Sequence, residues 1–163
     1  MAKRSFKPGK HDLSVKRSRT GLGLFTNEDI PRGACVIEYT GVRLTEKEYK
    51  ASNSKYLFEV GGKGALDGSP RWNTARYINH SCRPNCEPDT RGGRAFIFAK
   101  RNIKAGEELN YDYGNDYFDE YINGSCLCRM CSPPLNDKNA IVVKPKKITA
   151  KRKERPNRDA KSP

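Results

Sequence analysis

The sequence predicts a mostly β fold in a single domain, and three observations carry this prediction. Short runs rich in Val, Ile, Tyr and Phe clearly outnumber segments with helical periodicity. Gly-rich or Asp/Gly/Pro breaks separate these runs. A chain of 163 residues is long enough for one hydrophobic core but hardly for two. We therefore expect small β-sheets with few short helices, flanked by tails.

The first expected strands follow a basic N-terminal segment. Residues 20–25, TGLGLF, and residues 27–41, NEDIPRGACVIEYTG, predict two short strands, with a turn at residues 31–33. The two glycines around Leu22 would let a ligand approach the backbone closely. A single G-x-G pattern more often marks only a turn, so this signal is weak by itself.

One helix and several further strands are expected in the rest of the domain. Thr45 is a candidate N-cap, and Glu48 three residues later completes a capping box that opens a short helix. Further short strands are predicted at KYLFEV, GALDG, RAFIFAKRN and EELNYDYG. From about Asn136 onward Lys, Arg and Pro dominate, and only AIVV at residues 140–143 is compatible with a last strand.

The basic charge is concentrated at the two ends of the chain. Of the formal net charge of +13, residues 1–20 carry +6 and residues 138–163 carry +8, which leaves residues 21–137 at −1. Basic tails bind polyanions by neutralising phosphates, and such binding weakens as salt rises. We therefore expect the tails to contact DNA or nucleosomes, with simple solvated disorder as the alternative.

The sequence also indicates a reducing compartment. No apolar run approaches the ~20 residues that a membrane span needs, and MAKRSFKPGKHDLS lacks the apolar core of a secretory signal. We therefore expect an intracellular protein with no membrane partner, and not a disulfide-rich secreted domain. In such a compartment, clustered cysteines more often bind metal or lie in the core than form disulfides. Cys35, in the apolar run ACVIEY, is expected in the core.

The segment GSCLCRMCSPP holds the strongest metal signal. Cys126, Cys128 and Cys131 form a C-x-C-x-x-C cluster, which is a poor disulfide set and a good partial zinc shell. Tetrahedral zinc needs a fourth sulfur or nitrogen ligand from elsewhere in the chain. The candidates are Cys82 and Cys86, with His80 and His11 behind them.

Two polar motifs indicate a site for chemistry. Residues 76–86, RYINHSCRPNC, crowd polar and sulfur-bearing side chains into one expected loop. In GEELNYDYG, strand alternation directs Tyr111 and Tyr113 to one side and Asp112 to the other. Paired tyrosines are common in cores, but a pair directed into a cavity offers aromatic walls and hydroxyl groups that donate and accept.

These motifs resemble the SET-domain family of protein lysine methyltransferases, with a post-SET-like zinc cluster. The resemblance runs from about Lys16 to Pro133. GLGLFTNEDIPRGACVIEYTG is similar to the family's opening strands, RYINHSCRPNC to its R-F-I-N-H-S-C-x-P-N signature and GEELNYDYG to its G-E-E-L-T-x-D-Y signature. The resemblance implies small β-sheets and a threaded, pseudoknot-like C-terminal segment that brings the two signatures together.

The resemblance also divides the chain. It implies a SET domain at residues 16–120 and a post-SET-like zinc-binding segment at 121–135, between a basic arm at 1–15 and a basic, disordered tail at 136–163. Two departures from the family pattern stand out. Only two residues separate Cys128 from Cys131 where the family usually has four, and no Cys-rich segment precedes the domain.

The implied ligands are S-adenosylmethionine and a structural zinc ion. Cys82 is the implied fourth zinc ligand beside Cys126, Cys128 and Cys131, and Cys86 is an implied non-ligand neighbour. The signature loop would contact the adenine and amino-acid parts of the cofactor through backbone and side chains. The implied cofactor-binding residues are Gly21, Leu22, Gly23, Tyr56, Arg76, Asn79, His80 and Tyr113.

The implied activity is methylation of a protein lysine, on a histone or histone-like basic protein. A free lysine has a pKa near ~10.4, so apolar burial and the sulfonium charge of the cofactor must favour its neutral form. Tyr113 would orient the amine, Tyr56 would line the lysine channel, and Tyr111 would limit the product mainly to monomethyl-lysine, with some dimethyl-lysine. The acidic residues expected to attract the basic peptide are Asp112, Asp116, Asp119 and Glu120.

The resemblance to histone-modifying enzymes favours a chromatin location in a eukaryote or for a host-directed effector, and a cytoplasmic or nucleoid location in a bacterium. A competing hypothesis is a catalytically weak, zinc-stabilised nucleic-acid-binding module with basic tails. This hypothesis explains the tails and the cysteines. It leaves the NHSCRPN and ELNYDYG motifs without a purpose.

Overall fold

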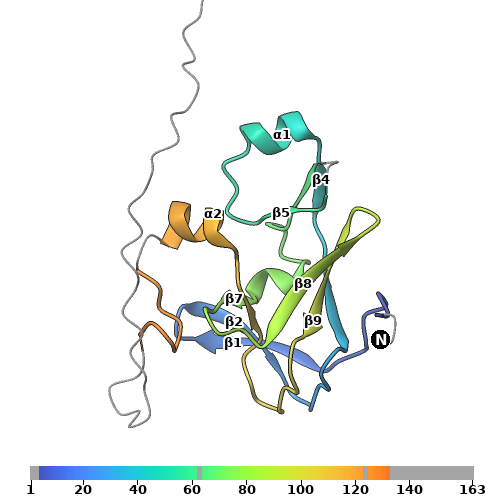
Figure 1. Ribbon diagram of the computed structural model, residues 1–163, viewed down its shortest axis with the longest axis vertical. Coiled ribbons are helices and arrows are strands. Elements are labelled where there is room, and N and C mark those ends of the chain that lie inside the picture. Colours follow the sequence, from blue (N-terminus) through green and yellow to red (C-terminus); the bar gives the residue numbers. More distant parts are fainter. Residues whose placement is uncertain (1–3, 62–63, 123–124, 133–163) are drawn as a thin grey trace, which may run out of the picture.

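The computed structural model describes residues 4–61, 64–122 and 125–132. Within these residues the fold is mostly β, with short strands in small sheets and a few helical turns (Figure 1). The part of the chain that is described contains no helix long and apolar enough to cross a membrane. The predicted strand at residues 140–143 and the predicted tail at 136–163 lie outside the described residues.

The larger part of the fold consists of an antiparallel hairpin and a three-stranded antiparallel sheet. Strands β1 (Leu13–Ser18) and β2 (Gly21–Thr26) make a hairpin. Strands β3 (Cys35–Tyr39), β9 (Arg94–Ala99) and β8 (Cys86–Arg91) make a three-stranded sheet with β9 in the centre. All residues of β9 after Arg94 are buried, because each face of this central strand is covered by side chains. This explains why RAFIFA is a continuous apolar run without alternation.

A smaller lobe carries the predicted helix. Strands β4 (Val42–Leu44), β6 (Ala65–Asp67) and β5 (Leu57–Glu59) form a second three-stranded sheet with β6 in the centre. Helix α1 (Glu46–Ala51) lies beside this sheet (Figure 1). Its predicted capping box is confirmed: the Thr45 side chain accepts a hydrogen bond from the Glu48 N–H, and the Glu48 carboxylate accepts one from the Thr45 N–H at 2.8 Å.

The remaining elements are short and lie in or next to the two signature segments, residues 76–86 and 106–114. They are the 3₁₀ turn η1 (Thr74–Tyr77), strand β7 (Asn79–His80), strand β10 (Asn110–Tyr111), helix α2 (Asn115–Tyr117) and the π-helical turn η2 (Phe118–Ile122). Strand β10 pairs with β7 in parallel, with Asn110 opposite Asn79 and Tyr111 opposite His80. The late segment therefore returns to lie beside the middle of the chain, as the expected threading requires.

The N-terminal segment packs on the three-stranded sheet. The ring of Phe6 contacts those of Phe96 and Phe98 edge to face, with centroid distances of 5.4 and 5.3 Å. Arg4 forms ion pairs with Glu87 and Asp89 of β8. Residues 4–12, which the sequence places in a basic arm, thus cover the face of β9 opposite the main core. A single Phe among basic residues carries no periodicity, so the sequence gives no sign of this packing.

Phe6→Ala is expected to lower the free energy of unfolding by about 1–3 kcal/mol, less than for a fully buried phenylalanine because Phe6 is only half-buried. The loss arises because the substitution uncovers Phe96 and Phe98. Urea denaturation of both proteins measures it. Lys7→Ala, at the exposed next residue, is the control and should leave the free energy of unfolding unchanged. Equal stability of Phe6→Ala and the native chain would mean that residues 4–12 do not hold the sheet.

Candidate active site

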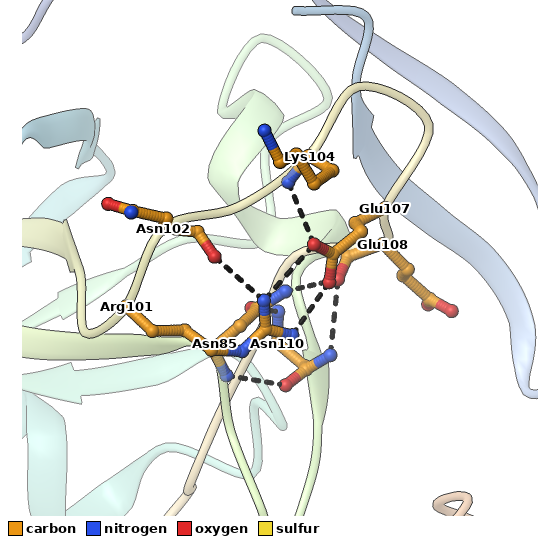
Figure 2. Close-up of polar contacts among 7 residues, drawn as sticks. All are labelled: Asn85, Arg101, Asn102, Lys104, Glu107, Glu108 and Asn110. Atoms are coloured by element: carbon orange, nitrogen blue, oxygen red, sulfur yellow. Dashed lines mark hydrogen bonds and ion pairs between the residues drawn. The ribbon is translucent and has the colours of Figure 1, made fainter. Parts of the chain in front are cut away.

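The two signature segments are fixed to each other by a buried asparagine (Figure 2). Asn85, which is only 2% exposed, donates from its backbone N–H to Asn110 Oδ1 at 3.0 Å, and its own Oδ1 accepts the Asn110 N–H at 2.9 Å. Its side-chain amide also donates to the Glu108 carbonyl at 2.8 Å. A buried amide with its hydrogen bonds made stabilises one arrangement of the backbone. Asn85 therefore sets where β10 enters the site.

An ion pair fixes the turn that precedes β10 (Figure 2). Arg101 Nη2 lies 2.6 Å from Glu107 Oε2, and the Lys104 N–H donates to Glu107 Oε1 at 2.7 Å. Hydrogen bonding from Arg101, with help from Lys104, lowers the pKa of Glu107 although partial burial opposes the shift. The carboxylate stays ionised at neutral pH and keeps this turn closed.

The β1–β2 hairpin, called the glycine hairpin here for Gly21 and Gly23, contacts the paired strands β7 and β10 through Glu108. The Glu108 carboxylate accepts hydrogen bonds from Ser18 Oγ at 2.7 Å and from the Asn79 side-chain amide at 2.8 Å. A Cβ atom on Gly23 would come too close to this carboxylate and to Ser18 Cβ, so a larger residue here would require the Glu108 side chain to shift. Asn79 also donates to the Leu22 carbonyl at 3.0 Å. The β1–β2 hairpin and the signature loop are thereby locked together.

Tyr113 lies at the centre of the site with its hydroxyl already oriented. The hydroxyl donates to the Ile78 carbonyl at 2.7 Å, and the Tyr113 N–H donates to His80 Nδ1 at 3.2 Å. Burial, with neighbouring tyrosines and Glu108 adding to it, raises the pKa of Tyr113 well above its usual range. The hydroxyl is therefore neutral at physiological pH. It can accept a hydrogen bond but is not available as a base.

Tyr111 packs beside Tyr113, on the same side as predicted, although the predicted strand is shorter than expected and β10 ends at Tyr111. The two ring centroids lie 4.9 Å apart, while Asp112 between them is exposed. Burial, and to a lesser degree the neighbouring Tyr113, raises the pKa of Tyr111 well above its ordinary value. Its hydroxyl is neutral too, and no hydrogen-bond partner for it lies among the described residues.

His80 uses both ring nitrogens within the protein. Its Nδ1 accepts the Tyr113 N–H, so the neutral ring carries its proton on Nε2, which lies 3.3 Å from Cys82 Sγ. Burial lowers the pKa of His80, although Asp112, 3.7 Å away, opposes the shift. The ring is therefore neutral at physiological pH. Its ring nitrogens connect the Tyr113 segment to a cysteine.

Arg76 has an incomplete set of partners. Its guanidinium carbon lies 4.2 Å from the centroid of the Tyr56 ring, and Nη1 donates to the Ser69 carbonyl. Its Nε atom is buried and has no hydrogen-bond partner among the described residues. A buried donor without a partner is costly, and an anionic or carbonyl group bound beside it would satisfy it.

Four cysteine sulfurs lie together at the C-terminal end of the described chain. The Sγ atoms of Cys82, Cys126, Cys128 and Cys131 all lie within 4.8 Å of one another. Cys82 Sγ is 3.9 Å from Cys126 Sγ and 3.6 Å from Cys131 Sγ. Four sulfurs bound tetrahedrally at about 2.3 Å from one zinc would be about 3.8 Å apart. The cluster is therefore close to the size of a four-sulfur metal site, and small shifts of the side chains would complete it.

The electrostatics of this cluster favour a thiolate at one position. Although burial opposes ionisation, hydrogen bonds from the Cys82 and Cys131 backbone, and from other donors around the sulfur, lower the pKa of Cys128 to about 7. Burial raises the pKa of Cys126 to about 11 and that of Cys82 above its ordinary value. Backbone donors gathered on one sulfur are the usual surroundings of a metal-bound thiolate.

The other candidates for the fourth ligand lie elsewhere. Cys86 is fully buried in the main core, and burial raises its pKa to about 12. His11 Nδ1 lies 2.6 Å from Glu28 Oε1, away from the sulfurs. Cys35 lies in the second apolar cluster with Phe96 and Phe98, as the sequence predicts, and burial raises its pKa to about 11.

Two cavities meet at Tyr113. The first, which we call the signature cavity, measures about 770 Å³. Residues of the glycine hairpin, of the signature loop at 76–86 and of the cysteine segment at 125–132 line it, including Leu22, Asn79, His80 and Leu127. The tyrosine cavity, of about 530 Å³, is lined by six tyrosines, which are Tyr39, Tyr49, Tyr56, Tyr111, Tyr113 and Tyr117. Both cavities include the same wall residues, which are Lys55, Tyr56, Arg76, Tyr113 and Tyr117.

The tyrosine cavity has an acidic rim. Glu59, Asp112, Asp116 and Glu120 line it, against Lys55 and Arg76 as the cations. Three of these acidic residues are among the four expected from the sequence. Glu59 is an addition, and Asp119 does not line the cavity. A cationic peptide would be attracted to this rim.

Sequence reasoning missed three residues that shape the site. Asn85 and Glu108 hold the two signatures and the glycine hairpin together, and both stand inside the quoted motifs. Tyr117 forms part of the wall between the cavities, with its ring centroid 4.9 Å from that of Tyr113. A polar side chain within a motif gives no sequence signal that it binds a distant segment of backbone, because its partner lies far along the chain.

Comparisons with known proteins agree with this geometry. The SET domain family matches residues 21–114. Histone-lysine N-methyltransferase trithorax of Drosophila virilis is 41% identical over 140 residues, which are 78% of this chain and 4% of that protein. Histone-lysine N-methyltransferase trr of Drosophila melanogaster is 38% identical over 132 residues, which are 73% of this chain and 5% of that protein. The chain thus spans only a small part of the curated relatives it matches.

A solved structure is similar in fold as well. The crystal structure of KRYPTONITE in complex with mCHH DNA, an H3(1–15) peptide and SAH has a TM-score of 0.58 and 34% sequence identity. The similarity covers 69% of this chain and 25% of that chain. The family match at residues 21–114 alone spans more than half of the chain. The chain belongs to the SET-domain family.

Proposed function

We propose that this chain is an S-adenosylmethionine-dependent protein-lysine N-methyltransferase that acts on a histone or histone-like basic protein. The observation that carries this proposal is the meeting of two cavities at Tyr113. Methyl transfer needs a donor and an acceptor on opposite sides of one point, because the displacement at the methyl carbon is in line. The shared wall provides such a point, with a neutral hydroxyl at its centre.

The signature cavity has polar groups of the kinds that S-adenosylmethionine requires, both hydrogen-bond acceptors and donors. Asn79 Oδ1 accepts no hydrogen bond from the described residues and could accept one from the ammonium group. Arg76, with its unpartnered Nε, could receive the carboxylate. The ring of His80 and the side chain of Leu127 line the same cavity and could contact the adenine. Of the three hairpin residues expected to bind the cofactor, Leu22 lines the cavity, whereas Gly21 and Gly23 do not. Bound there, the cofactor supplies an electrophilic methyl group.

The residues of this chain position the acceptor amine. Six tyrosine side chains surround the tyrosine cavity, and this partly apolar enclosure favours the neutral form of a lysine amine. The Tyr113 hydroxyl donates to Ile78 and so presents its oxygen lone pairs, which can accept an N–H from the amine. Tyr56 lines both cavities and would hold the lysine stem. The acceleration then comes from positioning and electrostatics, without a covalent intermediate.

The acidic rim supports a basic peptide as substrate. Glu59, Asp112, Asp116 and Glu120 would attract the positive charges that flank a lysine in a histone tail. The names of the relatives, and the H3 peptide in the KRYPTONITE complex, support a histone in particular. We propose a nuclear, chromatin-associated location on the same grounds.

The four-cysteine cluster is proposed to hold one structural zinc ion. The sulfur separations and the thiolate character of Cys128 fit a tetrahedral zinc site with no open position. We keep the proposed division into a SET domain at 16–120 and a post-SET-like segment at 121–135. Residues 133–135 and the basic tail at 136–163 lie outside the described residues.

The test of the proposal is incubation with labelled S-adenosylmethionine and core histones. Label on a lysine, located by mass spectrometry, is the expected result. No label on histones or on a lysine peptide array, together with tight DNA binding, would favour the alternative of a zinc-stabilised binding module. Addition of the cofactor product SAH should suppress labelling in proportion to its occupancy.

Tyr111→Phe is expected to change the product without loss of the first transfer. We propose that the Tyr111 hydroxyl, which has no partner among the described residues, holds a water molecule or the amine and occupies the volume that added methyl groups need. Such discrimination is worth about 1–3 kcal/mol, enough to stop a stepwise reaction mainly at monomethyl-lysine. The variant should accumulate di- and trimethyl-lysine.

Mass spectrometry of a peptide taken to completion measures this shift. Tyr39→Phe is a suitable control, because its hydroxyl lies in the same cavity but already donates to the Tyr56 carbonyl at 2.9 Å. The control should keep the native product. A native chain that readily accumulates trimethyl-lysine would show that Tyr111 does not limit methylation.

A further inference from the structure

A third cavity lies against the cysteine segment and does not include Tyr113. It measures about 730 Å³. We call it the arginine cavity because five arginines line it. They are Arg17, Arg19, Arg83, Arg101 and Arg129. They come from the β1–β2 hairpin, the signature loop, the turn before β10 and the cysteine segment. Four distant parts of the chain thus bring the same functional group to one concave surface.

Four of the five guanidinium groups carry no ion pair, and three of these four have no hydrogen-bond partner among the described residues either. Arg101 is paired with Glu107, and Arg19 donates to the Ser132 carbonyl. Arg17, Arg83 and Arg129 are exposed and form no salt bridge with any residue that the structure describes. The fold therefore concentrates positive charge here without neutralising it.

The acidic residues of the arginine cavity are already bound. Glu107 is held by Arg101, and Glu108 by Ser18 and Asn79. Five arginines against two glutamates leave the lining with a net charge of +3. Like charges gathered in a concave surface repel each other, and an anion that binds there removes the repulsion. The chemistry of the cavity calls for a ligand with several negative charges.

We propose that the arginine cavity binds the phosphate backbone of a duplex nucleic acid. Guanidinium groups match phosphate oxygens with two parallel hydrogen bonds. Arginines spread along one surface fit a ligand whose charges repeat, as they do in a nucleic-acid backbone, better than a ligand with one charge. Such contacts position a nucleic acid without reading its sequence.

Two further features favour this occupant. Ser132, the last described residue, lies at the cavity because Arg19 contacts it, and the chain then continues toward residues 138–163 with their net charge of +8. The cavity and the basic tail are therefore continuous along the chain. The tyrosine cavity, in contrast, has an acidic rim. The two surfaces suit the two opposite charges of chromatin, a cationic histone tail and anionic DNA.

The proposal adds a binding site to the proposed activity and does not depend on it. The arginine cavity shares five lining residues with the signature cavity, which are Thr20, Asn79, His80, Leu127 and Cys128. Its arginines, however, are absent from the lining of the signature cavity, where the arginines are Arg71 and Arg76. Nucleic-acid binding and cofactor binding are thus separable by mutation.

The test compares two triple variants of the full chain. In the first, Arg17→Gln, Arg83→Gln and Arg129→Gln remove the unpaired charges of the cavity. In the matched control, Lys10→Gln, Arg32→Gln and Lys47→Gln remove three exposed charges outside it. Fluorescence anisotropy measures the affinity for a 20-base-pair DNA duplex and for an RNA duplex of the same length, between 50 and 200 mM salt. Calorimetry measures the affinity for SAH.

The cavity variant is expected to bind the duplexes at least about tenfold more weakly than the native chain, with a salt slope smaller by about 2–3, since each phosphate contact contributes about 0.9. The control should differ much less, and SAH affinity should be native in both variants. The duplex that binds more tightly shows whether the site is for DNA or for RNA. Equal duplex affinity in the cavity variant and the control would overturn the proposal. So would a loss of SAH affinity confined to the cavity variant, because the arginines would then belong to the cofactor site.

Discussion

Tyr113→Phe is expected to reduce methyl transfer about 100- to 1000-fold, the loss typical of removing one preorganised polar group from a reaction centre. The substitution keeps the ring between Tyr111 and Tyr117 and removes only the hydroxyl. That hydroxyl is fixed by its 2.7 Å hydrogen bond to Ile78 and, under the proposed function, accepts an N–H from the substrate amine. Turnover of a lysine peptide under single-turnover conditions measures the effect.

SAH affinity and the pH dependence of the rate distinguish orientation of the amine by Tyr113 from two other roles, which are cofactor binding and action as a general base. SAH affinity should stay close to native, because the ring still forms the wall of the signature cavity. Burial keeps the pKa of Tyr113 above its ordinary value, so the hydroxyl does not ionise in the working range. The residual activity of the variant should therefore show the same rise with pH as the native chain, a rise that reflects deprotonation of the substrate lysine. Loss of the alkaline rise in the variant would indicate that Tyr113 acts as a base.

Tyr121→Phe is the matched control for this prediction. The Tyr121 ring lies tilted against that of Tyr117, with a centroid distance of 4.7 Å, and Tyr121 is 39% exposed at the outer edge of the signature cavity. The same chemical change at this exposed position should leave turnover within about twofold, as surface substitutions usually do. Native turnover in Tyr113→Phe would contradict the assignment of the hydroxyl to the reaction centre.

The parts of the site that the sequence predicted are those whose chemistry is local. The cysteine cluster follows from the spacing of Cys126, Cys128 and Cys131, and the capping box at Thr45 needs only the residue three positions later. The shared side of Tyr111 and Tyr113 follows from extended backbone over three residues, although strand β10 itself ends at Tyr111. Each of these signals lies within one short segment, where geometry follows directly from residue spacing.

The parts that the sequence did not predict depend on contacts between distant segments. Asn85 and Glu108 are clamps only because the chain returns to place β10 beside β7. The arginine cavity is assembled from four parts of the chain, and no charge run in the sequence marks it. Phe6 packs on β9 across about ninety residues of sequence. Such contacts are set by tertiary packing, which local periodicity does not encode.

His80 illustrates how a correct motif can leave a side chain's partners open. The sequence predicted contacts with the cofactor through both backbone and side chain. In the structure the ring nitrogens bind the Tyr113 N–H and approach Cys82 Sγ, so only the ring face and the backbone remain for a ligand. The same contacts link the cysteine cluster to the Tyr113 segment. A change in the structure of the cysteine cluster should therefore alter the signature cavity.

Removal of the proposed zinc ion is expected to weaken cofactor binding at least about tenfold while leaving the β-sheets folded. Cys126, Leu127 and Cys128 line the signature cavity, and one zinc held by the four sulfurs would fix their backbone. Structural zinc contributes about 10–16 kcal/mol of apparent binding free energy in zinc-finger peptides. The main core contains only Cys86 of the six cysteines, so its packing does not depend on the cluster. The loss should thus be confined to the cysteine segment and the cavity beside it.

Cys128→Ser is the sharpest way to test this, with Cys86→Ala as the matched control. Elemental analysis should find about one zinc per chain in the native protein and in the control, as a single four-cysteine site requires, and almost none in Cys128→Ser. SAH affinity should fall at least about tenfold with the metal, because an unordered cavity wall must be ordered on binding. Circular dichroism should show the β-rich fold in all three proteins. Zinc affinity should also fall as pH is lowered, since protons compete for the thiolates. Native SAH affinity in a sample verified to be free of metal would show that the cluster does not support the cofactor pocket.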